Sequence, residues 1–133
     1  MPKVKVNNTQ GLVQESGGGI ALFGATQSLT AASTSAADSK ILATTSLCLV
    51  SSANDSRKVQ LPETSGLDDG HTLVIGNVLS HDVIIEKEDA ADRINGVDGA
   101  LTIGQSTAVK FVYSGTADPG WIAVVGDGAT IPA

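Results

Sequence analysis

Apolar and polar positions alternate along the C-terminal third of the chain. Residues 101–103, 108–113 and 121–125 form three short apolar runs, separated by clusters of turn-forming residues. In the second and third runs the larger side chains fall on every second position, a period typical of strands that bury one face. Three of the four aromatic residues of the chain lie in these runs. We therefore expect this segment to supply much of the core.

Similar short runs continue the pattern upstream, at residues 46–52, 57–62, 71–77 and 80–86. Turn-forming residues separate them, so that strands recur roughly every 8–12 residues, the spacing expected of a sandwich or barrel. No long segment has the period of a helix, which disfavours architectures that alternate strands with helices. The pattern predicts an all-β fold, a small antiparallel sandwich or barrel-like domain.

The first 45 residues follow a different pattern. Residues 1–24 mix short apolar and polar pieces, and the glycines at 17–19 are costly to order unless the backbone must bend or approach a neighbour closely. Residues 25–45 are low in complexity and nearly uncharged. We predict an extended N-terminal arm that lies along a partner, with an ordinary edge strand and glycine turn as the alternative. The chain then divides into an arm and connector, 1–45, and a β-domain, 46–133.

Charge narrows the possible partners. The net charge is −6, so the chain lacks the basic footprint of a nucleic-acid-binding protein. Only 17% of the residues are charged, against about a quarter in a typical soluble domain. A sheet protein with so few charges favours a surface that other chains cover, which predicts a homo-oligomer or attachment to a larger assembly.

Other features limit the cellular setting. No apolar run is long enough to cross a membrane, so no membrane partner is expected. The N-terminus has basic residues without the apolar core of a signal peptide. The single cysteine, Cys48, allows no internal disulfide. Synthesis in the cytoplasm followed by assembly agrees with these features.

The sequence contains no motif that predicts a metal site. His71 and His81 each lie beside an expected strand, without a cysteine partner or a second histidine at ligand spacing. Solvent-facing or capping roles suit them better. The acidic residues between 86 and 92 lack the spacing and glycine turn of a calcium loop, so a solvated hairpin loop is expected there.

Catalytic motifs are also missing, and we predict neither an enzyme nor a cofactor. The chain has no nucleophile elbow and no glycine-rich phosphate-binding loop. Cys48 lies inside an apolar run, where a thiol acts as a small buried hydrophobe with a raised pKa. Tyr113 and Trp121 could form a sugar-stacking platform, but a chain with four aromatic residues favours the core or a subunit contact for them.

Six short pieces then occur in a set order. They are V-Q-L-P (59–62), D-G-H-T-L-V-I-G-N (69–77), D-V-I-I (82–85), R-I-N-G (93–96), L-T-I-G-Q-S-T-A-V-K-F-V-Y (101–113) and G-W-I-A-V (120–124). Together they resemble a β-module of tailed-bacteriophage virion proteins, found in capsid decoration (cement) proteins and in short tail-fibre modules. The resemblance implies that I-N-G is a turn, that a tryptophan strand closes the domain, and that the module assembles as a trimer.

The length of 133 residues favours one kind of virion protein, since a fibre normally needs an attachment domain, a shaft and a receptor tip. We predict a phage capsid decoration protein that binds the major capsid protein on the outer surface of the virion. It would act as a homotrimer and stabilise the shell against internal pressure. The alternative is a small tail-fibre or adhesin module that binds host-surface glycans.

Two sets of contact residues follow. For the capsid contact we predict residues of the arm, namely Lys3, Val4, Lys5, Val6, Leu12 and Val13. For the trimer contact we predict Phe111, Tyr113 and Trp121, with the core of the subunit itself as the alternative.

Overall fold

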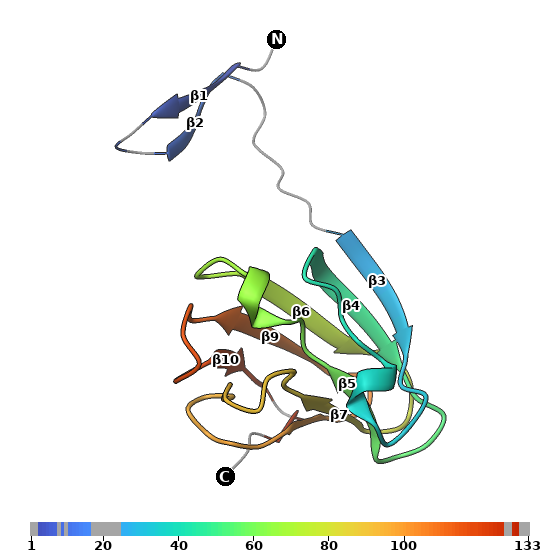
Figure 1. The fold of residues 1–133 in the computed structure, drawn as a ribbon. Helices are drawn as coiled ribbons and strands as arrows, with labels where there is room; N and C mark the ends of the chain where they lie inside the picture. Colours follow the sequence, from blue (N-terminus) through green and yellow to red (C-terminus); the bar gives the residue numbers. More distant parts are fainter. Residues whose placement is uncertain (1–2, 8, 10, 17–24, 127–128, 131–133) are drawn as a thin grey trace.

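A computed structural model describes residues 3–7, 9, 11–16, 25–126 and 129–130 of the chain. These residues form short strands (Figure 1). This part of the chain contains no α-helix, which confirms the all-β class. The strands are β1 (Lys3–Asn7), β2 (Gly11–Ser16), β3 (Ala25–Thr30), β4 (Thr45–Ser51), β5 (Arg57–Gln60), β6 (Thr72–Asn77), β7 (Val83–Glu86), β8 (Leu101–Ile103), β9 (Ala108–Tyr113), β10 (Trp121–Val124) and β11 (Ala129–Thr130). Two 3₁₀ helices, η1 (Ala36–Asp38) and η2 (Thr64–Gly66), join them.

Two sheets form a sandwich. One has five strands in the order β10-β9-β6-β4-β3, and the other has four in the order β11-β8-β7-β5. Along β4, β6, β7, β8 and β9 buried positions alternate with more exposed ones, so each sheet buries one face. The buried side chains of both sheets form one apolar cluster between them.

The predicted antiparallel arrangement is wrong for three strand pairs, and both sheets are mixed. β4 runs parallel to β3 and to β6, and β5 runs parallel to β7. The chain crosses from one sheet to the other at each step from β4 to β7, and therefore re-enters each sheet in the same direction. Period-two alternation is the same in parallel and antiparallel strands, so the pattern did not reveal this.

Residues 25–45, assigned from the sequence to the connector, contribute to the sandwich. Within them, β3 pairs with β4, and Ala31 and Ile41 belong to the buried core. The Gln27 side chain donates to the carbonyl of Lys40 (3.1 Å) and accepts from the Thr45 hydroxyl (2.9 Å). Small polar residues thus build an edge strand and cover one side of the core. The low complexity of this segment gave no strand pattern from which this could be predicted.

The aromatic residues occupy the centre of the core. Trp121 is fully buried between Phe111 and Tyr113, with ring-centroid distances of 6.4 and 5.4 Å. The R-I-N-G segment forms the turn that the resemblance implied, with Asn95 and Gly96 at φ values of 53° and 76°. Positive φ at both central residues is what a type I′ turn requires.

The first strands form a sheet of their own. β1 and β2 are an antiparallel pair in which Val6 lies opposite Leu12 and Lys5 opposite Val13. The predicted arm therefore contains a hairpin. The triple glycine at 17–19 lies outside the described residues.

Candidate interaction face

The outer side of the five-stranded sheet presents a row of apolar side chains. Pairing places Leu47 of β4 beside Val74 of β6, then Lys110 of β9 and Val124 of β10. The residues on either side of Val74 and Lys110 are buried, as is Ala123 before Val124, so this row points outward. Val124 is 60% exposed.

Neighbouring rows are mostly apolar, with Thr72 beside Val112, and Thr26 and Ser28 of β3 lie beside Leu47 and Leu49. Leu49 lies beside Gly76 and Ala108, and Val112 lies beside Ile122. All five are partly or fully exposed. The set, called the apolar face below, comprises Leu47, Leu49, Val74, Gly76, Ala108, Lys110, Val112, Ile122 and Val124. Its one charged member is Lys110.

Nothing in the described part of the chain covers the middle of this face. A Cβ atom added to Gly76 would meet a single side-chain atom within 4 Å, Leu49 Cδ2 at 3.7 Å, which belongs to the face itself. An apolar sheet surface of this kind without a covering layer marks an interaction site in a soluble protein. The apolar face is therefore the candidate functional site.

The outer side of the four-stranded sheet is different. Its outward positions, called the polar face below, are Lys58, Gln60, Ile84, Glu86 and Thr102, and each is partly buried. Lys58 Nζ lies 2.6 Å from Glu86 Oε1 across β5 and β7. Charged and hydroxyl groups suit this side to contact with water.

An acidic groove of about 450 Å³ borders the polar face, lined by Gln60, residues 86–90 and residues 98–100. Its carboxylates already have partners. Glu88 pairs with Lys40 (3.2 Å), and Asp98 accepts a hydrogen bond from Lys87, which lowers the pKa of the Asp98 carboxyl. Among the residues that the structure describes, no cluster of three or more acidic, histidine or cysteine side chains could hold a metal ion.

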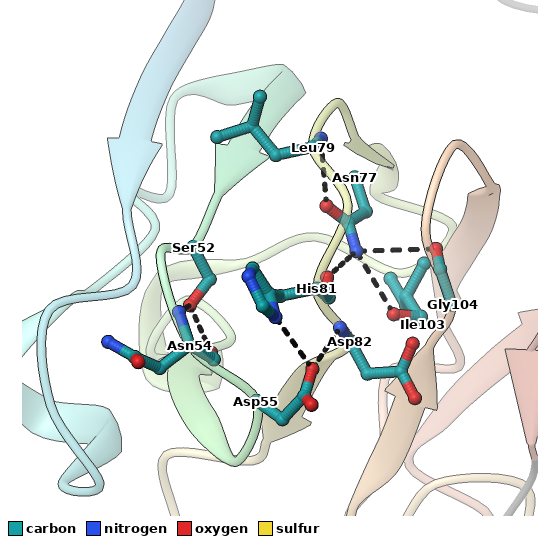
Figure 2. A network of polar contacts seen from close by, with 9 residues as sticks. All are labelled: Ser52, Asn54, Asp55, Asn77, Leu79, His81, Asp82, Ile103 and Gly104. Atoms are coloured by element: carbon teal, nitrogen blue, oxygen red, sulfur yellow. Dashed lines mark hydrogen bonds and ion pairs between the residues drawn. The ribbon is translucent and has the colours of Figure 1, made fainter.

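One end of the sandwich is fixed by Asn77, which is 2% exposed (Figure 2). Its amide nitrogen donates to the carbonyls of His81 (2.7 Å), Ile103 (3.2 Å) and Gly104 (3.2 Å), and its oxygen accepts from the Leu79 amide (3.3 Å). Since Ile103 belongs to the opposite sheet, this side chain connects the two layers. A buried amide with all its bonds satisfied holds its surroundings in one arrangement.

The two histidines do not act together. At the surface, His81 Nδ1 lies 3.1 Å from Asp55 Oδ1, which also accepts from the Asp82 amide (3.2 Å) (Figure 2). The rings of His71 and Trp121 instead pack nearly at right angles, with their centroids 6.4 Å apart. His81 is near the expected surface position, whereas His71 packs on the core.

Cys48 has the environment that the sequence predicted. It is completely buried in β4, and burial raises the pKa of its thiol to about 11. A thiol of that pKa is protonated at neutral pH and is a poor nucleophile.

The residues predicted for the trimer contact belong to the core of a single subunit. Phe111 and Trp121 are completely buried and Tyr113 is 7% exposed, so they offer no surface to a partner. Large aromatic residues do concentrate at interfaces, but in this chain they fill the space between the sheets. The assignment of these three residues to a subunit contact is therefore wrong.

The residues predicted for the capsid contact lie in the N-terminal hairpin. Lys3, Val4, Lys5 and Val6 belong to β1, and Leu12 and Val13 belong to β2. Their contact with a shell stays a prediction.

A signal for the apolar face was present in the sequence. S-L-C-L-V, T-L-V-I-G and W-I-A-V-V are continuous apolar runs, and such runs are typical of strands covered on both faces. Here one of those faces has no cover within the described residues.

The comparisons with known proteins add no family assignment. No protein-family model matches this sequence, and neither does any curated protein sequence. Within the described residues, no helix is long and apolar enough to cross a membrane.

Proposed function

We propose that this chain is a structural protein that self-associates through the apolar face and decorates the capsid of a tailed bacteriophage. In this proposal it forms a homotrimer on the outer surface of the shell, binds the major capsid protein, and stabilises the shell against internal pressure. The observation that carries the self-association is the apolar face, with one charged side chain among nine positions on an uncovered sheet. The phage setting rests on the sequence resemblance.

Burial of the aromatic residues weakens the glycan-binding alternative. Sugar platforms need exposed aromatic rings, and all three described aromatic residues are buried. The engaged carboxylates of the groove and the protonated Cys48 thiol likewise offer no reactive group. Binding is the activity that the geometry supports best.

The proposed mechanism is multivalent attachment. Three copies held together present three equal shell contacts, and the second and third contacts then form at high effective concentration. Each contact can therefore be weak while the trimer binds strongly. We propose that the N-terminal hairpin, with Lys3 and Lys5, supplies the shell contact.

The test has two measurements on the purified protein. Sedimentation gives its mass, and cosedimentation with expanded phage capsids gives its binding to a shell. We expect a trimer that binds saturably, and a Lys3→Glu/Lys5→Glu variant that stays trimeric but binds more weakly. A matched Lys58→Glu variant on the polar face should keep both properties. A monomer that does not bind capsids would end the proposal.

A further inference from the structure

Neighbouring segments of the chain cover two of the four outer edges of the sandwich. Along β5, Lys58 N donates to Ser33 O (3.0 Å), Gln60 N donates to Ser39 O (2.9 Å), and Ile41 N donates to Gln60 O (2.9 Å). Ser33, Ser39 and Ile41, on either side of η1, therefore cover that edge. Its backbone groups have partners within the subunit.

The edge at β10 is covered by the R-I-N-G turn. Trp121 N donates to Arg93 O and Asn95 N donates to Trp121 O, both at 2.8 Å. The side chain of Asn95 also accepts from the Ala123 amide at 2.8 Å. This turn closes most of the short strand, and the edge at β11 is only two residues long.

β3 is the exception. It lies at the outer edge of the five-stranded layer with only β4 beside it (Figure 1). Its sequence A-T-Q-S-L-T is uncharged, and four of its six side chains are exposed. Proteins block such edges with charged residues, proline, bulges or a covering segment, because an open edge pairs with other chains. Within the described residues β3 has neither a charge, a proline nor a covering strand, and the one register shift of its pairing, between Ala25 and Thr26, puts the extra residue in β4.

The open side of β3 carries the backbone groups of Thr26 and Ser28. Successive residues of a strand direct their N–H and C=O groups to opposite sides. The amides of Ala25 and Ala31 donate on the β4 side, at 3.2 and 2.8 Å. The N–H and C=O groups of the even-numbered residues between them therefore point to the open edge. The Thr30 carbonyl accepts from a serine hydroxyl. Thr26 and Ser28 have no backbone partner on this side among the described residues.

We propose that the open edge of β3 is paired with the N-terminal hairpin, β1–β2, of a second copy of this chain. This inference rests on the proposed self-association and adds a main-chain contact to that of the apolar face: β2 pairs with β3 of the neighbouring copy, which leaves β1, with Lys3 and Lys5, for the shell. A two-stranded hairpin is marginally stable alone in water, and β1–β2 shares no ladder with the sandwich of its own chain. Pairing with β3 would satisfy both elements through main-chain hydrogen bonds.

A contact of this kind can close into a ring. The donor is the hairpin and the acceptor is β3, so the contact is head-to-tail and uses two different surfaces of each subunit. Head-to-tail contacts close into rings when the rotation between copies allows it, and a trimer is such a ring. β2 and β3 have six residues each, so one strand can pair along the whole of the other.

Two kinds of variant test the pairing. Ser28→Pro removes the outward amide but no hydrogen bond within the subunit, because that amide faces the open edge. Ser28→Ala is the matched control that keeps the amide. We expect Ser28→Pro to weaken trimer formation at least tenfold, with an unchanged circular dichroism spectrum and Ser28→Ala trimeric. If Ser28→Pro associates like the wild type, the pairing proposal is overturned while the proposed function stands.

Cross-linking identifies the occupant. Copies with Val13→Cys are coexpressed with copies carrying Ser28→Cys and treated with a short bismaleimide. The unchanged chain, with Cys48 buried, serves as the control. A cross-linked pair containing one copy of each kind is the expected product. A chain that carries both changes is treated in the same way. If a link forms only within that chain, the edge belongs to its own hairpin and the proposal is overturned. The absence of any link would also overturn it. A monomeric wild type would instead contradict the proposed function.

Discussion

The two outer faces of the sandwich are built on the same strand geometry but carry different residues. On the five-stranded sheet the outward positions of the central strands are mostly valine, leucine, isoleucine, alanine and glycine around Lys110, with Thr72 on β6 and Thr26 and Ser28 on the edge strand β3. On the four-stranded sheet they include the Lys58–Glu86 ion pair, Gln60 and Thr102. Both sheets contribute buried side chains to the one apolar cluster between them, so the difference lies in their outer faces. It supports the proposal that one side of the domain binds other chains while the other side faces water.

A charge placed on the apolar face should have the largest effect. Val74→Glu lies at the centre of that face, and burying its carboxylate in a subunit contact without a partner costs about 4 kcal/mol. We expect the association constant to fall by about 1000-fold. Thr102→Glu, at an outward position of the polar face, should leave association unchanged. Equal loss in both variants, measured by sedimentation equilibrium, would remove the distinction between the faces.

The apolar face also depends on the placement of β10. Gly120, just before that strand, has φ of 71°, and a Cβ there would lie 2.1 Å from the Arg93 carbonyl oxygen. Gly120→Ala should lower the free energy of unfolding by about 3 kcal/mol. Gly66→Ala is the control, since a Cβ there meets nothing within 4 Å. Urea denaturation of both variants checks this, and a fully stable Gly120→Ala would contradict the close approach.

Asn77 tests the connection between the two layers. Asn77→Ala leaves three buried or partly buried carbonyls without their shared donor, and we expect a loss of about 2 kcal/mol in unfolding free energy. Asn54→Ala, in an exposed turn of the same end, should change it by less than about 0.5 kcal/mol. Similar values for the two variants in urea denaturation would show that the Asn77 bonds contribute little.

Two carboxyls near the acidic groove should make the free energy of unfolding change with pH in opposite directions. Burial, the largest cause, raises the pKa of Asp92, so its ionisation in the folded state costs stability as the pH rises above the ordinary value of 3.8. Asp92→Asn should therefore be more stable than the wild type near neutral pH, with Thr64 still donating to its side chain. The gain should vanish below the ordinary aspartate range.

Asp98 is the matched case of opposite sign. The hydrogen bond from Lys87 lowers the pKa of its carboxyl, so the stability it contributes is present at neutral pH and is lost as the pH falls through the lowered folded-state value. Asp98→Asn should be less stable than the wild type near neutral pH and equal to it in strong acid. Denaturation curves across pH in which both variants move in one direction would contradict the assignment.

The smallest effect is expected on the polar face itself. The Lys58–Glu86 pair is about one-third exposed on both sides, so water screens much of its attraction. Lys58→Met should lower the free energy of unfolding by about 0.5 kcal/mol or less and leave association unchanged. A larger loss of stability in urea denaturation would show that this pair is shielded more than its exposure indicates.

Period-two alternation predicted most strands and the all-β class, because alternation follows directly from a strand with one buried face. The apolar run around Cys48 predicted its burial, and the resemblance implied the turn at Asn95 and Gly96. Alternation did not predict the parallel pairing, since the direction in which a strand re-enters a sheet depends on the path between strands.

The site was harder to predict than the fold. Trp121 and Phe111 were assigned to a contact because large aromatic residues favour interfaces, yet volume places them in the core of a small domain with few other large side chains. β3 was missed because A-T-Q-S-L-T lacks large apolar residues; its neighbour β4 and the Gln27 hydrogen bonds define it instead. Edge exposure follows from strand order, which the chain pattern does not encode.

The central claim is that the apolar face joins copies of this chain. Native mass spectrometry of the wild type beside Val74→Glu and Thr102→Glu tests it most directly. For a chain of 13.4 kDa, we expect a mass three times that value for the wild type and Thr102→Glu, and a single-chain mass for Val74→Glu. A wild type that remains at the single-chain mass across micromolar concentrations would contradict it.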